Sequence, residues 1–274
     1  MSTPDAAVLQ ATFAEIERVR ARKGSLAVVG LCGAQGSGKS TLAQALFDRC
    51  REQGIAAATL SIDDLYLPRA ARQQLARSVH PLLATRGVPG THDIALGLEV
   101  IEALRRGEPC GLPRFSKAID DRLPRSAWET APEDCRLLLL EGWCVGARPQ
   151  APEALALPIN ELERLDDPEG VWRRFANDAL AGPYQHLFGA LDMLMLLRAP
   201  GFETVFGWRM QQEDALRARV GADAPGLMDA TQIARFIQHY ERLTRHILAE
   251  MPDRADLVVS MAADRAPVAI SSKA

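Results

Sequence analysis

Residues 33–40 read GAQGSGKS, which matches every fixed position of the pattern G-x-x-x-x-G-K-S. The apolar run 26–32 precedes them, and Leu42, Ala45 and Leu46 follow at the spacing of one helix face. A short continuous apolar run is typical of a buried parallel strand, so the glycines fall at a strand-to-helix turn. In that context the pattern forms a phosphate-binding loop. A glycine-rich turn without a ligand is the alternative.

Each residue type in this loop suits the binding of phosphate. Glycines can adopt positive φ and let backbone N–H groups approach an anion, and the positive end of the following helix points at the same place. Lys39 would reach the β- and γ-phosphates, and the Ser40 hydroxyl would ligate Mg²⁺. The expected ligands are therefore a nucleoside triphosphate and Mg²⁺. The residues predicted to contact the nucleotide are Gly33, Ala34, Gln35, Gly36, Ser37, Gly38, Lys39, Ser40 and Thr41.

The length and composition predict a single globular domain over residues 1–274, near the upper limit for one hydrophobic core. The formal net charge is -3 and no block of Lys or Arg stands out, so neither nucleic acid nor an anionic membrane is expected as a partner. The five cysteines are scattered without a C-x-x-C pair, as in reduced proteins. The N-terminal residues do not read as a secretory signal, and the longest apolar stretches are too short to span a bilayer. We therefore expect a cytoplasmic protein, and leave its oligomeric state open.

Apolar patterning predicts that strands and helices alternate along the chain. Buried strands are expected at 26–32, 55–62, 136–143, 191–197 and 255–261, with an edge piece at 267–270. Helices are expected at 5–22, after the phosphate loop, at 92–106, around 159–165, at 171–188 with a candidate break at 182–183, at 203–220 and through 233–247. The alternation predicts an α/β fold of the P-loop NTPase type. Such a fold is a three-layer sandwich whose mostly parallel central sheet, here of about five strands, has helices on both faces.

Carboxylates lie at the carboxyl ends of two predicted strands. Asp63 and Asp64 follow the strand 55–62, and Glu141 lies near the end of 136–143. Because ligands of an open parallel sheet bind beyond these ends, Glu141 suits a Mg²⁺ ligand, directly or through water, and Asp63 suits the base in phosphoryl transfer to a hydroxyl. The alternatives are an acid that caps a neighbouring loop for Glu141 and a turn residue for Asp63. Asp64 is the weaker candidate, with a positioning role as its alternative.

Two other classes of nucleotide-binding protein can be tested against the sequence. A GTP-binding switch protein carries an N-K-x-D motif, and a transporter ATPase carries a signature like L-S-G-G-Q. Neither motif occurs in this chain, which disfavours both classes.

Six segments carry a resemblance to a known family: GxxGxGKST, TLSIDDLYLP, LLATRGVPGTHD, LPRFSKAxDDR, LLLLEGW and FGWRMQQE. Together they resemble the plant and fungal type D-glycerate 3-kinases and their bacterial relatives, which are P-loop kinases akin to phosphoribulokinase, uridine kinase and pantothenate kinase. The resemblance implies ATP-dependent, Mg²⁺-dependent phosphorylation of the primary hydroxyl of D-glycerate to 3-phosphoglycerate. The alternatives are a kinase of the same fold that acts on uridine, pantothenate or a sugar phosphate, and a non-kinase regulator that hydrolyses ATP.

The resemblance also implies roles for single residues. Asp63 matches the catalytic carboxylate of related kinases, and Glu141 matches their Walker B acid. Arg209 lies in a segment, about 200–222, that is similar to the lid that brings an arginine over the transferring phosphate. The alternative for Arg209 is a helix face of i, i+4 ion pairs, since an acid and an arginine follow it one and two turns later. The catalytic set implied is Lys39, Asp63, Glu141 and Arg209.

Cations in the predicted insertions, at about 66–132, suit an acidic acceptor. Guanidinium binds carboxylate bidentately, and a carboxylate such as that of glycerate requires a cation. Arg86, Arg114 and Lys117 lie in loops that should face the site, which makes them candidates for that contact. Their alternative is that each is a solvated loop cation.

A histidine and an acid begin the helix predicted at 92–106. Thr91 is the expected N-cap, with His92 and Asp93 in the first turn. These two side chains would bind the hydroxyls of the acceptor, and a simple helix-start pair is the alternative. The predicted substrate-binding set is Asp63, Tyr66, Arg86, His92, Asp93, Arg114 and Lys117.

Overall fold

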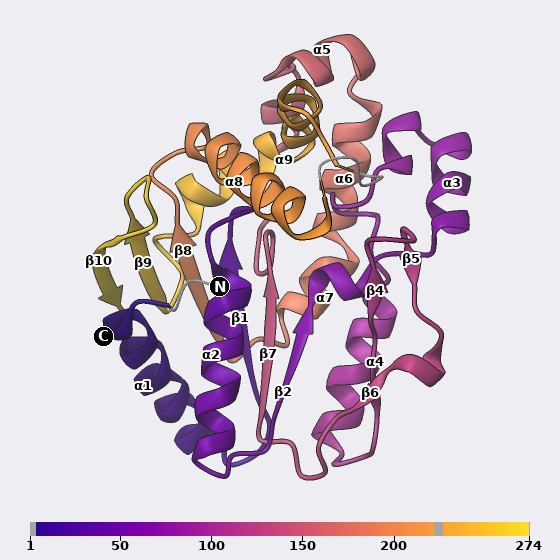
Figure 1. Ribbon diagram of the computed structural model, residues 1–274. Helices are drawn as coiled ribbons and strands as arrows, with labels where there is room; N and C mark the ends of the chain where they lie inside the picture. Colours follow the sequence, from indigo (N-terminus) through magenta and orange to yellow (C-terminus); the bar gives the residue numbers. More distant parts are fainter. Residues whose placement is uncertain (1–3, 222–226, 274) are drawn as a thin grey trace.

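The computed structural model describes residues 4–221 and 227–273, and a six-stranded sheet in the order β10-β9-β8-β1-β7-β2 forms its centre (Figure 1). The strands from β9 to β2 pair in parallel, and β10 pairs antiparallel with β9 at the edge. The predicted, mostly parallel α/β sheet is confirmed, and the predicted edge piece is its sixth strand. The strands are β1 (Ala27–Gly33), β2 (Ala57–Ser61), β7 (Leu137–Gly142), β8 (Met193–Arg198), β9 (Leu257–Met261) and β10 (Pro267–Ser272).

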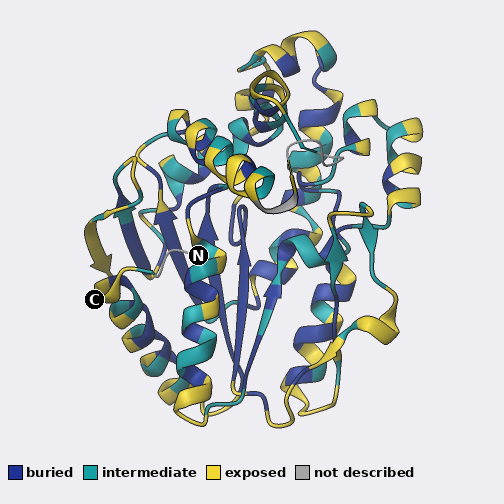
Figure 2. Ribbon diagram, viewed as in Figure 1, coloured by how far each residue is buried: buried dark blue, intermediate teal, exposed yellow. Residues whose placement is uncertain are grey.

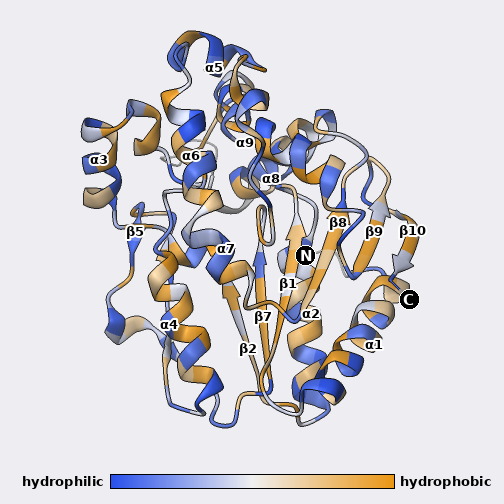
Figure 3. Ribbon diagram, turned by 180° about the vertical axis from the view of Figure 1, so that it is seen from behind, coloured by the Kyte–Doolittle hydropathy of each residue, from blue (hydrophilic) through white to orange (hydrophobic). Residues whose placement is uncertain are grey.

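Helices cover both faces of the sheet: α1 and α2 lie on one face, and α4 and α7 on the other (Figures 1 and 3). Among the described residues, none of the helices combines the length and the apolar character needed to cross a membrane. The α-helices are α1 (Ala6–Lys23), α2 (Lys39–Glu52), α3 (Arg69–Ser78), α4 (Ile94–Arg105), α5 (Glu161–Asp166), α6 (Val171–Ala181), α7 (Pro183–Phe188), α8 (Glu203–Val220) and α9 (Ala230–Glu250). The 3₁₀ helices are η1 (Ile62–Leu65), η2 (Pro81–Ala84), η3 (Arg125–Ala127) and η4 (Pro152–Leu155).

Successive residues of the central strands face opposite helix layers. In β1, Ala27, Val29 and Leu31 belong to the core shared with α1 and α2, whereas Val28 and Cys32 belong to the core shared with α4 and α7. Figure 2 shows the central strands buried along their length, while β10 is exposed at the edge. Burial on both faces is why these strands read as unbroken apolar runs rather than as alternating patterns.

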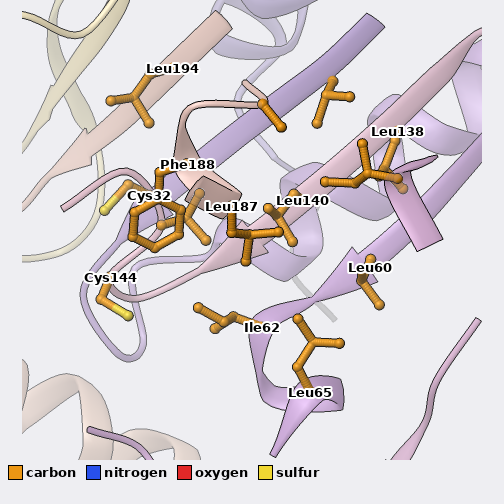
Figure 4. Close-up of a cluster of buried hydrophobic side chains, with 14 of the residues drawn as sticks. Cys32, Leu60, Ile62, Leu65, Leu138, Leu140, Cys144, Leu187, Phe188 and Leu194 are labelled. Carbon is orange, nitrogen blue, oxygen red and sulfur yellow. The ribbon is translucent and has the colours of Figure 1, made fainter. Parts of the chain in front are cut away.

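The turn that follows β2 is held in place by its own apolar residues, which are buried in the core. Ile62 and Leu65 are both fully buried, and they pack in the cluster that also contains Leu140 and Leu187 (Figure 4). Asp63, which lies between them in η1, is only partly buried. The apolar pair thus fixes the turn and presents the carboxylate at the upper edge of the sheet.

Two predicted helices differ from the observed ones at identifiable positions. The helix predicted at 92–106 begins at Ile94, because the Asp93 carboxylate, and not Thr91, accepts the N-capping hydrogen bond, from Leu96 N at 3.2 Å. The helix predicted at 171–188 is two helices, α6 and α7, which divide at 182–183. Proline lacks the N–H that a continuous helix would need there.

Several elements gather beyond the carboxyl ends of the parallel strands, where the arrowheads in Figure 1 point. They include α3, α8 and α9, together with the small antiparallel pair β4–β5, whereas a second such pair, β3–β6, lies beside α4. These pairs bring the predicted extended segment at 112–117 against the following polar loop. Their strands are β3 (Gly111–Leu112), β4 (Phe115–Ser116), β5 (Asp121–Arg122) and β6 (Glu129–Thr130).

Helix α8 packs directly on the glycine-rich turn between β1 and α2. Gly36 has a φ of 78°, and a Cβ added there would lie 2.6 Å from the Cβ of Trp208. Trp208 is buried and donates a hydrogen bond from Nε1 to Ala263 O at 2.6 Å. Only glycine therefore fits at this position.

We predict that Gly36→Ala lowers the free energy of unfolding by about 1–3 kcal/mol, because it combines backbone strain with a steric contact. Gly207→Ala is the matched control, since a Cβ there, next to Trp208 on α8, meets no atom within 4 Å. Urea unfolding monitored by circular dichroism measures both. Equal midpoints for the two variants would contradict the analysis.

Candidate active site

The glycine-rich turn connects β1 to α2 as predicted, with Lys39 as the first residue of the helix. Gly38 precedes the helix with a φ of 90°, and no atom within 4 Å would meet a Cβ there. The Ser37 hydroxyl and the Gln35 side-chain oxygen are buried without a hydrogen-bond partner. Buried polar atoms normally have partners, and of these two groups the Ser37 hydroxyl is the one that can donate to a bound phosphate ester, since the Gln35 oxygen is an acceptor.

Ser40 and Glu141 meet where α2 begins beside β7. The Ser40 hydroxyl donates to Glu141 Oε1 at 2.9 Å, and the other carboxylate oxygen is buried without a partner. Within the described ranges no group of three or more His, Cys, Asp and Glu side chains could enclose a metal ion. A hydroxyl and one carboxylate fit Mg²⁺, which keeps several waters and takes its remaining ligands from phosphates.

Asp63 lies one strand away from Glu141, since β2 pairs with β7 in a register that opposes Ser61 to Glu141. Tyr66 donates a hydrogen bond to Asp63 Oδ1 at 2.7 Å, and Lys117 Nζ binds Oδ2 at 2.6 Å. Burial alone would raise the pKa of Asp63, but the charge and hydrogen bond of Lys117, the Tyr66 hydroxyl and the charge of Lys39 together lower the pKa to about 2. Asp63 is therefore ionised at neutral pH.

Asp64 points to the neighbouring hairpin instead. Its Oδ1 accepts a hydrogen bond from Phe115 N at 3.0 Å, and its Oδ2 lies 3.6 Å from the Arg114 guanidinium. Burial, opposed by these contacts, raises the pKa of Asp64. The carboxylate thus attaches the β4–β5 hairpin, which carries Lys117, to the end of β2.

His92 and Asp93 point in different directions. The His92 ring is buried, stacks on Tyr66 at 4.7 Å between centroids and has Nδ1 2.5 Å from the Tyr184 hydroxyl. That hydroxyl also accepts the Gly90 N–H at 3.0 Å, and with its own proton assigned to Nδ1 the imidazole proton is assigned to Nε2. Nε2 is buried without a partner, whereas Asp93 both caps α4 and forms an ion pair with Arg122 at 3.1 Å.

The predicted acceptor-binding cations all have acidic partners. Arg86 forms an ion pair with Asp120, and Arg114 binds Glu129 Oε2 at 2.9 Å as well as approaching Asp64. The partner of Lys117 is Asp63 itself. Of the three, Lys117 is thus the one whose present partner is the predicted base.

Arg209 forms an i, i+4 ion pair with Glu213 at 2.6 Å. Glu213 is buried and also accepts a hydrogen bond from Met228 N at 2.7 Å. The predicted continuation of the stack to Arg217 is not observed, because Arg217 pairs with Asp214 at 2.9 Å. The charge of Arg209 nevertheless acts on Tyr240, and this interaction connects α8 to the site. Burial raises the pKa of Tyr240, and the charges of Arg86 and Arg209 oppose that rise.

Two residues in contact with the site had no signal in the sequence. Tyr240 reads as part of the apolar face of α9, yet its hydroxyl donates to Arg86 O at 3.0 Å. Arg265 lies in the β9–β10 connection, and its Nε donates to Gly36 O at 2.5 Å. Both contacts join segments that are more than 150 residues apart, which local spacing does not reveal.

No family model matches the chain. The chain is 34% identical over 224 residues to an uncharacterized kinase of Schizosaccharomyces pombe, mug58, and the match covers 78% of each protein. It is 28% identical over 258 residues to the chloroplastic D-glycerate 3-kinase of Arabidopsis thaliana, with 88% of this chain but 54% of the plant chain covered. This chain therefore spans about half the length of that relative. A solved D-glycerate 3-kinase from Cryptococcus neoformans has a TM-score of 0.82 at 24% identity, with 98% of this chain and 100% of that chain covered.

The buried, neutral His92 predicts a loss of stability in acid. Burial lowers its pKa from the ordinary value of 6.5 to about 4, against the opposing charge of Asp63. As pH falls from about 6.5 to about 4, the unfolded chain takes up a proton that the folded chain does not, so the free energy of unfolding falls, by up to about 3 kcal/mol.

Urea unfolding at a series of pH values measures this effect. His92→Gln should reduce the slope over that range, while His186→Gln, which changes an exposed histidine on α7, should keep the wild-type slope. A slope that His92→Gln leaves unchanged would show that His92 does not cause it.

Proposed function

The chain belongs to the family of P-loop kinases that includes D-glycerate 3-kinases, and on that premise we propose that it transfers the γ-phosphate of ATP to the primary hydroxyl of D-glycerate. The products are 3-phosphoglycerate and ADP. The observation that carries the proposal is the position of Asp63. Its ionised carboxylate lies one strand away from Glu141 and is in contact with a cation, Lys117, that suits an acidic acceptor.

In the proposed site the glycine-rich turn, residues 33–41, binds the phosphates of ATP. Its backbone N–H groups and Lys39 face the phosphates, and the unsatisfied Ser37 hydroxyl adds a donor. Ser40 and Glu141 hold Mg²⁺, since their oxygens are already 2.9 Å apart and one Glu141 oxygen is unsatisfied. When bound, Mg²⁺ supplies charge stabilisation for the transferring phosphoryl group.

Residues of the insertions bind the acceptor. Asp63 accepts the proton of the attacking hydroxyl, and Tyr66 fixes the orientation of that carboxylate through its 2.7 Å hydrogen bond. The Nε2–H of His92, buried without a partner, is a donor for an acceptor oxygen. The cations that contact the acceptor carboxylate are Arg86, Arg114 and Lys117, and Asp93 contributes by orienting the start of α4.

The lid is proposed to be α8, with Arg209 as the residue that approaches the transferring phosphate. Its guanidinium is held by the buried Glu213 at 2.6 Å, so its geometry is preorganised. In the transfer, the acceptor oxygen forms a bond to the γ-phosphorus as its proton passes to Asp63. The bond between that phosphorus and the bridging oxygen breaks, and ADP leaves with the electron pair.

An acceptor panel tests the proposed substrate. We expect Mg-ATP turnover to ADP that depends on D-glycerate, with D-glycerate preferred over uridine, pantothenate and ribulose 5-phosphate. Coupled measurement of ADP release, with the phosphorylated product identified by mass spectrometry, decides among them. Rapid turnover with another acceptor and none with D-glycerate would reject glycerate, and equal ATP hydrolysis without any acceptor would favour a regulator.

Removal of the base tests the mechanism. We expect Asp63→Asn to lower kcat by about 10²–10⁴-fold, because the amide cannot accept the hydroxyl proton, while Mg-ATP binding is retained. Asp134→Asn is the matched control, since it makes the same chemical change at an exposed turn. A kcat within a few-fold of wild type for Asp63→Asn would remove Asp63 from this role.

A further inference from the structure

The contact that suggests a further inference is the ion pair between Lys117 and Asp63. Lys117 Nζ lies 2.6 Å from Asp63 Oδ2, and Tyr66 occupies Oδ1, so both carboxylate oxygens have a donor. A carboxylate that is bound to an ammonium group is a weaker base than a free one, because the cation stabilises its ionised form. In this arrangement the base and a cation for the substrate neutralise each other.

The Lys117 side chain can leave this position without a change in the fold. It is 62% exposed, whereas the hairpin that carries it is fixed at its backbone. Phe115 N is bound by Asp64, and the carbonyl of Asp120 accepts from the buried Arg72 guanidinium at 2.8 Å. The side chain of Lys117 therefore has room to reorient while its Cα stays in place.

We propose that Lys117 exchanges partners during the reaction, leaving Asp63 for the carboxylate of the acceptor, so that an anionic acceptor releases its own base. This inference rests on the proposed function, which supplies the acid. It makes Lys117 a specificity-determining residue: a neutral alcohol, which has no carboxylate to attract Lys117, leaves Asp63 paired and weakly basic.

The surroundings of Asp63 support this exchange. The other charged and titratable groups that act on Asp63 come from several elements: Lys39 of α2, Asp64 of η1, Tyr66 after η1, His92 before α4, Cys144 after β7 and Tyr240 of α9. Burial is the largest influence on Asp63 and raises its pKa, and Lys117 is the largest influence that lowers it. Withdrawal of Lys117 therefore makes the carboxylate more basic when the hydroxyl is in place.

The exchange also limits wasteful hydrolysis of ATP. Water that enters without an acceptor meets Asp63 still bound to Lys117, and its proton is accepted less readily. With the acid bound, the hydroxyl proton passes to Asp63, the oxygen–phosphorus bond forms, and ADP departs. Lys117 returns to Asp63 after the proton is lost to solvent and the phosphorylated acid leaves.

Kinetics of Lys117→Met test the exchange, with D-glycerate, glycerol or no acceptor present. We expect the ratio of kcat/KM for D-glycerate to that for glycerol to fall by about 10–100-fold, the loss of one charge-assisted hydrogen bond. Acceptor-free ATP hydrolysis should rise, and the acid limb of its pH profile should move to higher pH because Asp63 has lost its partner. Lys117→Arg should retain a preference for D-glycerate.

Lys23→Met is the matched control. Lys23 is also an exposed lysine, it pairs with Asp192 at 2.6 Å, and it is the last residue of α1. It should leave all three rates unchanged. If wild type depends on D-glycerate but Lys117→Met alters neither the ratio nor the hydrolysis, the exchange is wrong and the proposed function stands. If wild type uses glycerol and not D-glycerate, both are overturned.

Discussion

The parallel pairing of β1, β7 and β2 is the constraint on which the rest of the structure depends. In register, Leu31 of β1 and Ser61 of β2 both oppose Glu141 of β7. Parallel strands end at the same edge of a sheet, so whatever follows each strand meets there. Asp63 follows β2 and the glycine-rich turn follows β1, which is why two separate motifs meet in one candidate site. An antiparallel β7 would carry Glu141 to the opposite edge.

Polar side chains that bind backbone groups hold the connecting segments in place. Arg72 is fully buried, and its guanidinium donates to the carbonyls of Leu67, Ala84 and Asp120. Its charge is balanced by the Asp120 carboxylate at 2.8 Å and each of its three nitrogens has a partner, which offsets the cost of burying it. This one residue connects α3, η2 and the tip of the β4–β5 hairpin. It thereby fixes the frame in which Arg86 meets Asp120.

The sequence allowed the strand-to-helix turn, the parallel sheet and the strand-end acids to be predicted, because each follows from local spacing or from the rule on strand ends. The partners of long side chains could not be predicted in this way. Arg86, Arg114 and Lys117 read as free cations, since nothing local indicates that Asp120, Glu129 and Asp63 lie beside them.

Buried contacts between distant segments were equally hidden. Tyr240 belongs to the apolar stripe of α9, which correctly predicts that its side chain is buried. Its hydroxyl, however, binds the backbone of Arg86, which no helical periodicity encodes. The N-cap at Asp93 instead of Thr91 is a subtler case. Both residue types cap well, and the choice depends on Thr91 being held by its own loop, where its hydroxyl donates to Val88 O at 2.7 Å.

The acidic partners of Arg86, Arg114 and Lys117 also have an energetic consequence for the proposed reaction. Burying a cation that has no acidic partner costs desolvation free energy when the site forms. The carboxylate of the acceptor likewise loses its hydration when it binds. If a substrate carboxylate replaces an internal one, the number of charge-assisted hydrogen bonds to the cation is conserved. Recognition then costs the desolvation of the substrate and the loss of the ion pair at the internal carboxylate, which is left without its cation. The difference in binding free energy between two acceptors then depends mainly on whether each carries a carboxylate that can replace the internal one. It depends less on the size of the acceptor.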